Sequence, residues 1–204
     1  PLVNPGIRLT QIVGDHVTMK ISKRNCSARV ACTVLVCILT SFGMSAQALA
    51  TDLSGKVVFM RHALAPGNGD PNNFDLNDCA TQRNLDDDGR QQAKLIGKKL
   101  RGQRVVFSKI YSSEWCRCKE TAELLDMGKV IPFQALNSFY EHYFSQDELL
   151  PLLENALFEI EPGDAPILMV THFVTIAAVT GRSVSSGDLV VFDPVAGESF
   201  LFNP

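Results

Sequence analysis

The sequence has no internal repeat and no low-complexity segment, so neither a repeat protein nor a disordered chain is indicated. Its 204 residues are 46% hydrophobic and 20% charged, which is the composition of a globular protein. Domains commonly run about 100 to 150 residues, so the chain is too short for two ordinary domains. One domain with one core is therefore expected.

The chain also lacks an apolar run long enough to cross a membrane. The apolar run at residues 30–42 has 13 residues, and a helix of that length is roughly 20 Å long, short of the ~30 Å hydrocarbon core. The run follows a basic stretch that opens at Met19, and it precedes an A-L-A triplet whose small residues suit signal peptidase. We predict a signal peptide at residues 19–50, cleaved after Ala50, and a periplasmic or secreted protein without a membrane span after cleavage. Residues 1–18 carry no pattern of their own and are interpreted as translated upstream sequence.

Basic charge is scarce in the predicted mature chain. Residues 51–204 contain 14 Lys and Arg against 21 Asp and Glu, a net charge of about −7. An acidic body argues against nucleic acid or an anionic membrane as a partner. Any anion site must then be a local cluster of basic side chains. Nothing in the sequence indicates an oligomeric state.

Few cysteines remain in that part of the chain: Cys79, Cys116 and Cys118. An exported protein meets an oxidising compartment, so one disulfide is expected, joining Cys79 to either Cys116 or Cys118 and leaving one thiol. The alternative for Cys116 and Cys118 is a metal or redox pair. A zinc site would need further ligands at a different spacing, so no metal site is predicted.

Apolar runs alternate with amphipathic segments along residues 51–204. This alternation predicts a mainly parallel sheet covered by helices on both faces. A long polar loop, residues 63–84, follows the first strand and can cover a site. We expect strands at residues 57–60, 105–113, 129–131, 166–171, 189–192 and 199–202, and helices at residues 86–101, 114–125, 147–160 and 173–180.

Histidines follow two of the expected buried strands. Arg61 and His62 come directly after residues 57–60, and His172 comes directly after residues 166–171. A further expected strand ends in serines that are soon followed by Arg117. In an open α/β sheet the carboxyl ends of the parallel strands share one edge, where ligands bind. We therefore expect these four side chains to meet.

Four motifs occur in a fixed order: Arg61-His62 after a strand, then the segments 85–97 (LDDDGRQQAKLIG), 111–122 (YSSEWCRCKETA) and 170–172 (VTH). Over nearly the whole of residues 51–204 they resemble the histidine phosphatase superfamily, branch 1. The resemblance implies a phosphoglycerate mutase-like fold, a three-layer α/β/α sandwich. It implies that His62 is transiently phosphorylated, that Arg61 and Arg117 hold the phosphate, and that His172 is the second histidine of the pocket.

Within the superfamily, the segments 78–85 (DCATQRNL) and 115–118 (WCRC), together with the signal peptide, are similar to an exported subgroup related to a lipopolysaccharide-core heptose phosphatase. Phe173 follows His172, where the acid phosphatase and phytase branch has aspartate. The resemblance implies an exported phosphomonoesterase for a small phosphorylated substrate, such as a sugar or envelope glycolipid phosphate. A phosphate-binding module without turnover is the main alternative. A mutase is a weaker one, because its metabolites are cytoplasmic.

The predicted chemistry calls for no metal and no cofactor. A phosphomonoester brings about two negative charges, and each charge-assisted bond to a guanidinium is worth roughly 1.5 to 3 kcal/mol. Arg61 and Arg117 can therefore hold the ester themselves. Their positive charge also favours the neutral, nucleophilic form of His62, while a protonated His172 would stabilise the transition state.

The proton donor for the leaving group is the open point of the prediction. Relatives often have a glutamate after the third strand, where this chain has Ser138. Glu141 is our first candidate. The alternatives are a site without a dedicated acid, which would favour leaving groups such as that of phosphohistidine, or an acid from the loop: Asp70, Asp75 or Asp78. Two substrate-binding residues are also predicted: Asn68, which could instead only form a turn, and Arg83, which could instead only solvate the loop.

Overall fold

The computed structural model describes residues 51–204, and the predicted signal peptide and its cleavage site lie outside them. These residues build a six-stranded sheet in the order β3-β2-β4-β1-β5-β6. Strands β3, β2, β4 and β1 run parallel, whereas β5 is antiparallel to β1 and β6 to β5. The sheet is therefore mainly parallel with an antiparallel edge. The strands are β1 (Val57–Arg61), β2 (Lys109–Ser112), β3 (Val130–Pro132), β4 (Ile167–Thr171), β5 (Leu189–Asp193) and β6 (Glu198–Phe202).

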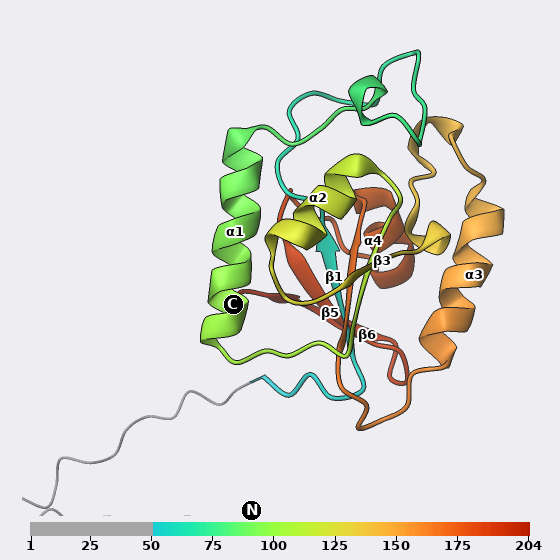
Figure 1. Ribbon diagram of the computed structural model, residues 1–204. Helices are drawn as coiled ribbons and strands as arrows, with labels where there is room; N and C mark the ends of the chain where they lie inside the picture. The colour runs from blue at the N-terminus through green and yellow to red at the C-terminus, as the bar shows by residue number, and fades with distance from the viewer. Residues whose placement is uncertain (1–50) are drawn as a thin grey trace, which may run out of the picture. The chain divides into compact units, whose positions relative to one another are not determined.

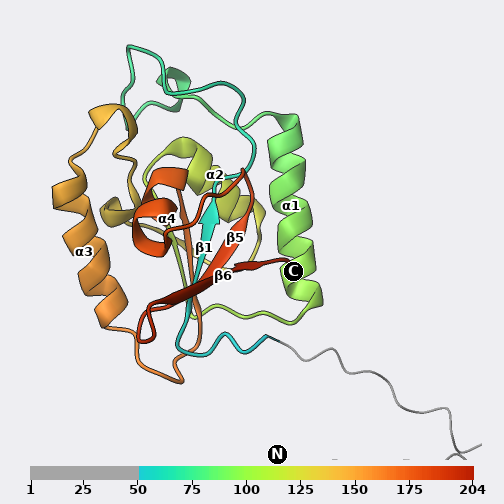
Figure 2. The ribbon, with the colours of Figure 1, turned by 180° about the vertical axis from the view of Figure 1, so that it is seen from behind.

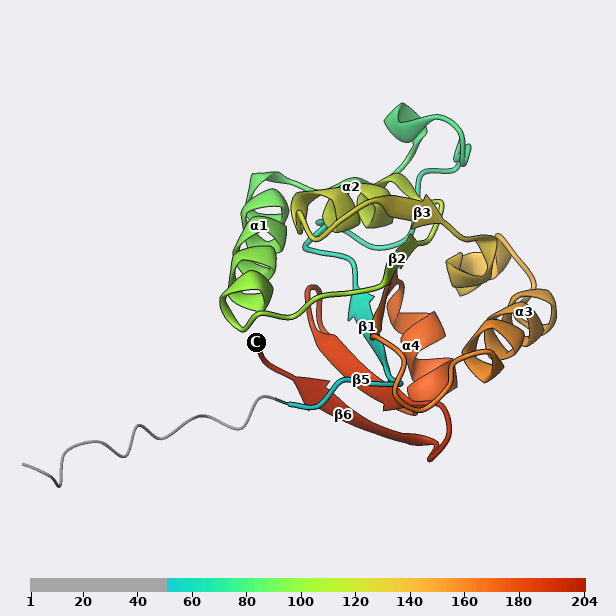
Figure 3. The same ribbon diagram turned by 60° about the horizontal axis from the view of Figure 1, so that its bottom comes forward.

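Helices cover both faces of the sheet, which confirms the predicted α/β fold. In Figure 3 the sheet lies between α1 and α2 on one side and α3 and α4 on the other. The helices are α1 (Asp87–Gly102), α2 (Cys116–Leu124), α3 (Gln146–Phe158) and α4 (Phe173–Thr180), with single 3-10 turns η1 (Cys79–Thr81), η2 (Gln134–Leu136) and η3 (Tyr140–His142). No helix within these described residues is long and apolar enough to cross a membrane.

Strand β1 is apolar throughout because both of its faces are buried. Val58 and Met60 belong to the core under α1 and α2, whereas Val57 and Phe59 belong to the core under α3 and α4. All four side chains are 0% exposed. Successive side chains of a strand point to opposite faces, so a central strand between two helical layers needs a continuous apolar run.

All elements lie within two residues of the predicted bounds except the second strand, which begins four residues later than predicted, and the second helix begins two residues later. Residues 105–108 were expected in the strand but precede it, because the backbone N–H of Val105 closes the end of α1 on the carbonyl of Leu100. Glu114 and Trp115 were expected in the helix but form a turn before it. Their backbone N–H groups are bound by the side chains of Asn137 and Ser113, which offers the backbone an alternative to the helix.

The register of the parallel strands brings the predicted site residues to one edge. Arg61 is paired with Thr171 across β1 and β4, and Ser112 is paired with Val170 across β2 and β4. The residues after the three strands are His62, Ser113 and His172, so they leave the sheet side by side. The loop of residues 63–84 arches over the end to which the β1 arrow points (Figures 1 and 2).

Helices α1 and α2 approach most closely at Gly97. A Cβ on Gly97 would lie 2.0 Å from the carbonyl oxygen of Leu125, whereas a Cβ on Gly102 of the same helix would meet nothing within 4 Å.

Alanine normally stabilises a helix by about 1 kcal/mol relative to glycine, but at Gly97 its Cβ would clash with the backbone of Leu125 and force the helices apart. We predict that Gly97→Ala lowers the free energy of unfolding by about 1 to 3 kcal/mol, as overpacking does. Gly102→Ala should not lower it, and urea unfolding of both variants measures the difference; equal stabilities would contradict the close approach.

Candidate active site

Two buried histidines lie next to each other at the carboxyl edge of the sheet. His62 and His172 are each 2% exposed, and their ring centroids are 5.6 Å apart. The Nδ1 atom of His62 lies 2.7 Å from the carbonyl oxygen of Ala63. A carbonyl only accepts, so this contact places the hydrogen of a neutral ring on Nδ1. The lone pair of Nε2 is then the free nucleophilic position of His62.

The surroundings of His62 keep its ring neutral. Burial, followed by the positive charge of Arg117 and smaller contributions from Arg83 and Arg61, lowers the pKa of His62 to about 3, although the bond to Ala63 opposes the shift. A histidine ordinarily titrates near 6.5. At neutral pH the ring is thus uncharged and able to attack an electrophile.

Arg61 and Arg117 each have one buried N–H group without an acceptor. Arg61 donates from Nη1 to the carbonyl of Val184 at 2.9 Å, and its guanidinium lies over the ring of Phe173. Among the residues that the structure describes, two buried side-chain nitrogen or oxygen atoms have no hydrogen-bond partner: Nε of Arg61 and Nε of Arg117. A buried donor without a partner is destabilising by about 1 to 3 kcal/mol. A bound anion would satisfy both, so the two arginines predicted as a clamp are the groups that an anion would complete.

Asp70 pairs with Arg117 and is not positioned as an acid. Its oxygens accept from Nη1 and Nη2 of Arg117 at 2.8 and 3.1 Å, and the two side chains are 3% and 4% exposed. Further bonds come from the backbone N–H of Arg83 and the indole N–H of Trp115. Burial alone would raise the pKa of Asp70, but the hydrogen bonds and charge of Arg117 outweigh it and the pKa is lowered. Asp70 is therefore the partner of Arg117 in this arrangement, and donation of a proton by Asp70 stays an untested alternative.

Arg83 lies among the charges of the site, but its side chain is used to fold the loop. Its Nε donates to the carbonyl of Gly69 at 2.8 Å, and its Nη1 donates to the carbonyl of Ala65. Its positive charge lowers the pKa of both His62 and His172. Arg83 thus contributes charge to the site, and direct binding of substrate by it stays a prediction.

The remaining candidates from the sequence lie at the surface. Asn68 and Glu141 are exposed. Asn68 donates to the hydroxyl of Tyr140 at 3.3 Å, and the carboxylate of Glu141 lies so close to Gly69 that a Cβ there would meet it at 2.6 Å. Asn68 is thus part of the loop that carries Asp70, and Glu141 lies against that loop. Asp75 and Asp78 are exposed as well, and their carboxylates cap turns of the loop by accepting from backbone N–H groups of Asn77 and Ala80.

The cysteines follow the predicted pattern. Cys79 and Cys116 form a disulfide with a Cα–Cα distance of 5.7 Å, which joins the loop to the residue before Arg117. Cys118 is free and buried, with its sulfur 3.5 Å from Nε2 of His172. Burial raises the pKa of the Cys118 thiol to about 12, so the sulfur remains protonated. Within residues 51–204, no three His, Cys, Asp or Glu side chains cluster as metal ligands.

Comparison with known proteins supplies the family. The model of the histidine phosphatase superfamily (branch 1) matches residues 57–156, which include His62, Arg61 and Arg117. The chain belongs to the histidine phosphatase superfamily. The resemblance deduced from the four ordered motifs is thereby confirmed. No curated protein matched the sequence.

Solved structures of other histidine phosphatases share the fold. The protein histidine phosphatase SixA complexed with tungstate superposes with a TM-score of 0.51 at 18% identity, over 72% of this chain and 94% of that one. A SixA protein from Nakamurella multipartitia gives 0.52 at 20% identity, over 72% and 93%. One from Agrobacterium tumefaciens gives 0.50 at 20% identity, over 73% and 96%. At these identities the likeness shows the fold alone, and membership of the exported heptose phosphatase subgroup stays a prediction.

Three residues of this histidine phosphatase site were missed from the sequence. Ser113 contacts His172 and is bonded to Asn137, both Ser113 and Asn137 are completely buried, and Glu114 is bonded to Asn137. Ser113 carried a signal, because it directly follows a strand that ends at the same edge as His62. Asn137 and Glu114 carried none, since their meeting depends on the path of the chain after β3.

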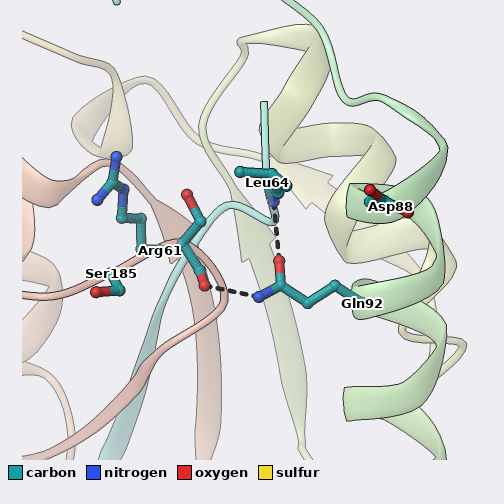
Figure 4. Close-up of a pocket in the computed structure, with 6 residues that line it drawn as sticks. Arg61, Leu64, Asp88, Gln92 and Ser185 are labelled. Atoms are coloured by element: carbon teal, nitrogen blue, oxygen red, sulfur yellow. Dashed lines mark hydrogen bonds between the residues drawn. The ribbon is translucent and has the colours of Figure 1, made fainter. Parts of the chain in front are cut away.

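A cavity of about 520 Å³ opens beside Arg61, between the start of α1 and the turn before β5. Figure 4 shows Arg61 on one wall and Asp88 and Gln92 of α1 on the other. Gln92 joins the walls, because it accepts from the backbone of Leu64 and donates to the carbonyl of Ser186. This cavity, whose lining is partly apolar and partly polar, adjoins Arg61 and has room for the group that carries a phosphate.

We predict that Asp70→Asn lowers the free energy of unfolding by about 3 kcal/mol, because removing one partner of a buried ion pair leaves the other charge uncompensated. Inorganic phosphate should restore part of the loss, since it supplies negative charge near Arg117. Urea unfolding with and without phosphate measures both effects. Asp75→Asn, in the same loop but exposed, is the matched control and should change neither value; an Asp70→Asn variant as stable as the wild type would contradict the role of the pair.

Proposed function

We propose that this protein is a metal-independent phosphomonoesterase that works through a phosphohistidine intermediate on His62. The observation that carries the proposal is the pair of buried Nε–H groups of Arg61 and Arg117 that lack partners beside a neutral His62. Phosphoryl transfer requires hydrogen-bond donors for the phosphate oxygens and a nucleophile with a free lone pair, and this site has both.

Three arginines bring positive charge to the site. Asp70 pairs with Arg117, and the charge of Asp188 acts on Arg61, so Arg61, Arg83 and Arg117 are only partly offset. The remaining positive charge attracts a phosphate dianion. Arg117 also lies in the first turn of α2, where backbone N–H groups and the helix dipole favour anions. This electrostatic arrangement supports both binding of the ester and spreading of charge onto its oxygens in the transition state.

The catalytic cycle has two steps. The Nε2 lone pair of His62 attacks phosphorus and the ester oxygen leaves; water then attacks the phosphohistidine and releases phosphate. The SixA relatives are described as acting on phosphohistidine. The cavity beside Arg61 has the polar side chains of Asp88, Ser185 and Ser186 in its lining, which would suit a hydroxylated leaving group such as a sugar or a glycolipid headgroup. We therefore infer a small phosphorylated substrate of this kind.

A second candidate function is a phosphate-binding module without turnover. It is favoured by the exposed position of Glu141 and by the ion pair of Asp70 with Arg117, since neither carboxylate is held as a free acid beside the two histidines. A mutase remains the weaker alternative. The two main candidates differ in one observable, the release of inorganic phosphate from an ester.

We predict that the purified protein hydrolyses p-nitrophenyl phosphate in the presence of a chelator and that His62→Ala abolishes the reaction. The imidazole is the phosphate acceptor, so the phosphoenzyme should also disappear from acid-sensitive, alkali-stable labelling of the chain. His142→Ala, at an exposed histidine of η3, is the control and should keep full activity. Phosphate binding without turnover in the wild type would favour the module, and loss of turnover in chelator would contradict the metal-free mechanism.

We further propose that the protein is exported and that residues 19–50 are removed. The supporting features are the basic stretch after Met19, the apolar run of residues 30–42 and the disulfide, which suits an oxidising compartment. The expected outcome is a periplasmic or secreted chain whose first residue is Thr51. Fractionation and amino-terminal sequencing test this, with Ala48→Asp as a variant that should block cleavage; an intact chain in the cytoplasm would contradict export.

A further inference from the structure

A chain of hydrogen bonds leads away from His172 to a carboxylate. The hydroxyl oxygen of Ser113 lies 3.0 Å from Nε2 of His172 and donates to Oδ1 of Asn137 at 3.1 Å. The Nδ2 of Asn137 donates in turn to a carboxylate oxygen of Glu114 at 2.7 Å. Ser113 and Asn137 are 0% exposed. Buried polar chains of this kind polarise one another, so a charge at one end is felt at the other.

The contacts of Asn137 fix the direction of every hydrogen in this chain. Its Oδ1 accepts from the backbone N–H of Glu114 at 2.8 Å while its Nδ2 donates to the carboxylate of the same residue. The opposite amide orientation would set donor against donor and acceptor against acceptor. Ser113 must therefore give its only hydrogen to Asn137. Its oxygen, which also accepts from the backbone N–H of Trp115 at 3.3 Å, can only accept from His172.

We propose that Glu114, Asn137 and Ser113 hold His172 with its hydrogen on Nε2, so that Nδ1 of His172 is the atom that carries the proton for the leaving group. This inference rests on the proposed phosphatase function and supplies the proton donor that the function needs. His172 is then a catalytic residue, and the other three are positioning residues. Neither Glu141 nor another carboxylic acid is required.

Phosphate binding would change the electrostatic surroundings of His172. Burial, followed by the positive charge of Arg117 and smaller contributions from His62, Arg83 and Arg61, puts the pKa of His172 well below 6.5. Cys118 beside Nε2 is a neutral thiol, and the charge of Asp70 is engaged by Arg117. A phosphate dianion offsets the effect of the positive arginines on the pKa of His172. The carboxylate of Glu114, at the other end of the hydrogen-bond chain, also favours the protonated form of His172. The proton therefore arrives together with the substrate.

The proton count of the cycle balances. A monoester that binds as the monoanion passes its proton to Nδ1 of His172. As the bond from Nε2 of His62 to phosphorus forms, the phosphorus–oxygen bond breaks and the leaving oxygen takes the proton from Nδ1. In the second step water attacks phosphorus, the phosphorus–nitrogen bond breaks, and Nδ1 takes a proton from the water. The product leaves with that proton, and His172 returns to its starting state.

Glu114→Gln tests the inference on two esters that differ in their need for a proton. Phenyl phosphate has a basic leaving group and p-nitrophenyl phosphate a weakly basic one. We expect kcat on phenyl phosphate to fall at least about tenfold, a modest part of what general acid catalysis contributes, and kcat on p-nitrophenyl phosphate to fall much less. Activity is lost as pH rises through the pKa of His172 in the complex, so removing the carboxylate should move that loss to lower pH.

Glu123→Gln changes an exposed glutamate of α2; it is the matched control and should match the wild type. The proposal would be overturned if Glu114→Gln lowered kcat equally on both esters and left the pH at which activity is lost unchanged.

Nitrogen NMR of the histidine-labelled protein gives a readout that does not depend on turnover. We expect hydrogen on Nε2 of His172 in the empty protein, protonation of Nδ1 when inorganic phosphate is added, and loss of the fixed tautomer in Ser113→Ala. Hydrogen on Nδ1 in the empty wild type would overturn the proposal. If the wild type shows the expected tautomer but hydrolyses neither ester, the phosphatase function fails while the positioning by Ser113 and Asn137 stands.

Discussion

Three guanidinium groups and two imidazoles share one buried region, and the carboxylate of Asp70 makes that arrangement possible. It takes both terminal nitrogens of Arg117 and also binds the backbone of Arg83 and the indole of Trp115. One side chain thereby joins the loop after β1 to the start of α2. Beside it the disulfide between Cys79 and Cys116 makes a second, covalent connection between the same two segments. The loop that closes the site is thus anchored where the site is charged.

The same pair explains why Arg117 still has a donor to offer. Asp70 occupies Nη1 and Nη2 and leaves Nε without a partner, and Val184 similarly occupies Nη1 of Arg61 while its Nε stays unpartnered. Unsatisfied buried donors reduce stability, and a bound anion would recover that energy. The two donors therefore favour binding of an anion such as phosphate, at the expense of the stability of the protein without ligand. Preorganised donors of this kind need little rearrangement when charge develops on the phosphate oxygens.

The site residues that follow strand ends could be predicted from the sequence, whereas those whose positions depend on the paths of loops could not. His62 and His172 were predicted together because each follows an apolar run, and parallel strands place such residues at one edge. The disulfide followed from three cysteines in residues 51–204. The pairing of Asp70 with Arg117 could not be predicted, because the loop that carries Asp70 has no periodic pattern. The place of Glu141 could not be predicted for a similar reason: it has a positive φ of 58°, and its carboxylate lies over Gly69, so its role as the acid stays a prediction.

His62 and His172 have the same residue type but opposite hydrogen-bond surroundings, and this difference assigns their roles. The carbonyl of Ala63 takes the hydrogen on Nδ1 of His62 and leaves Nε2 as a bare nucleophile. Ser113 accepts from Nε2 of His172 and leaves Nδ1 as the position that can gain a proton. The carbonyl of Ala63 favours a cation on His62 less than burial and the charge of Arg117 oppose one, whereas the hydrogen-bond chain from His172 ends on the carboxylate of Glu114. When phosphate brings negative charge between the rings, His172 is therefore the ring that becomes protonated, and His62 remains free to attack.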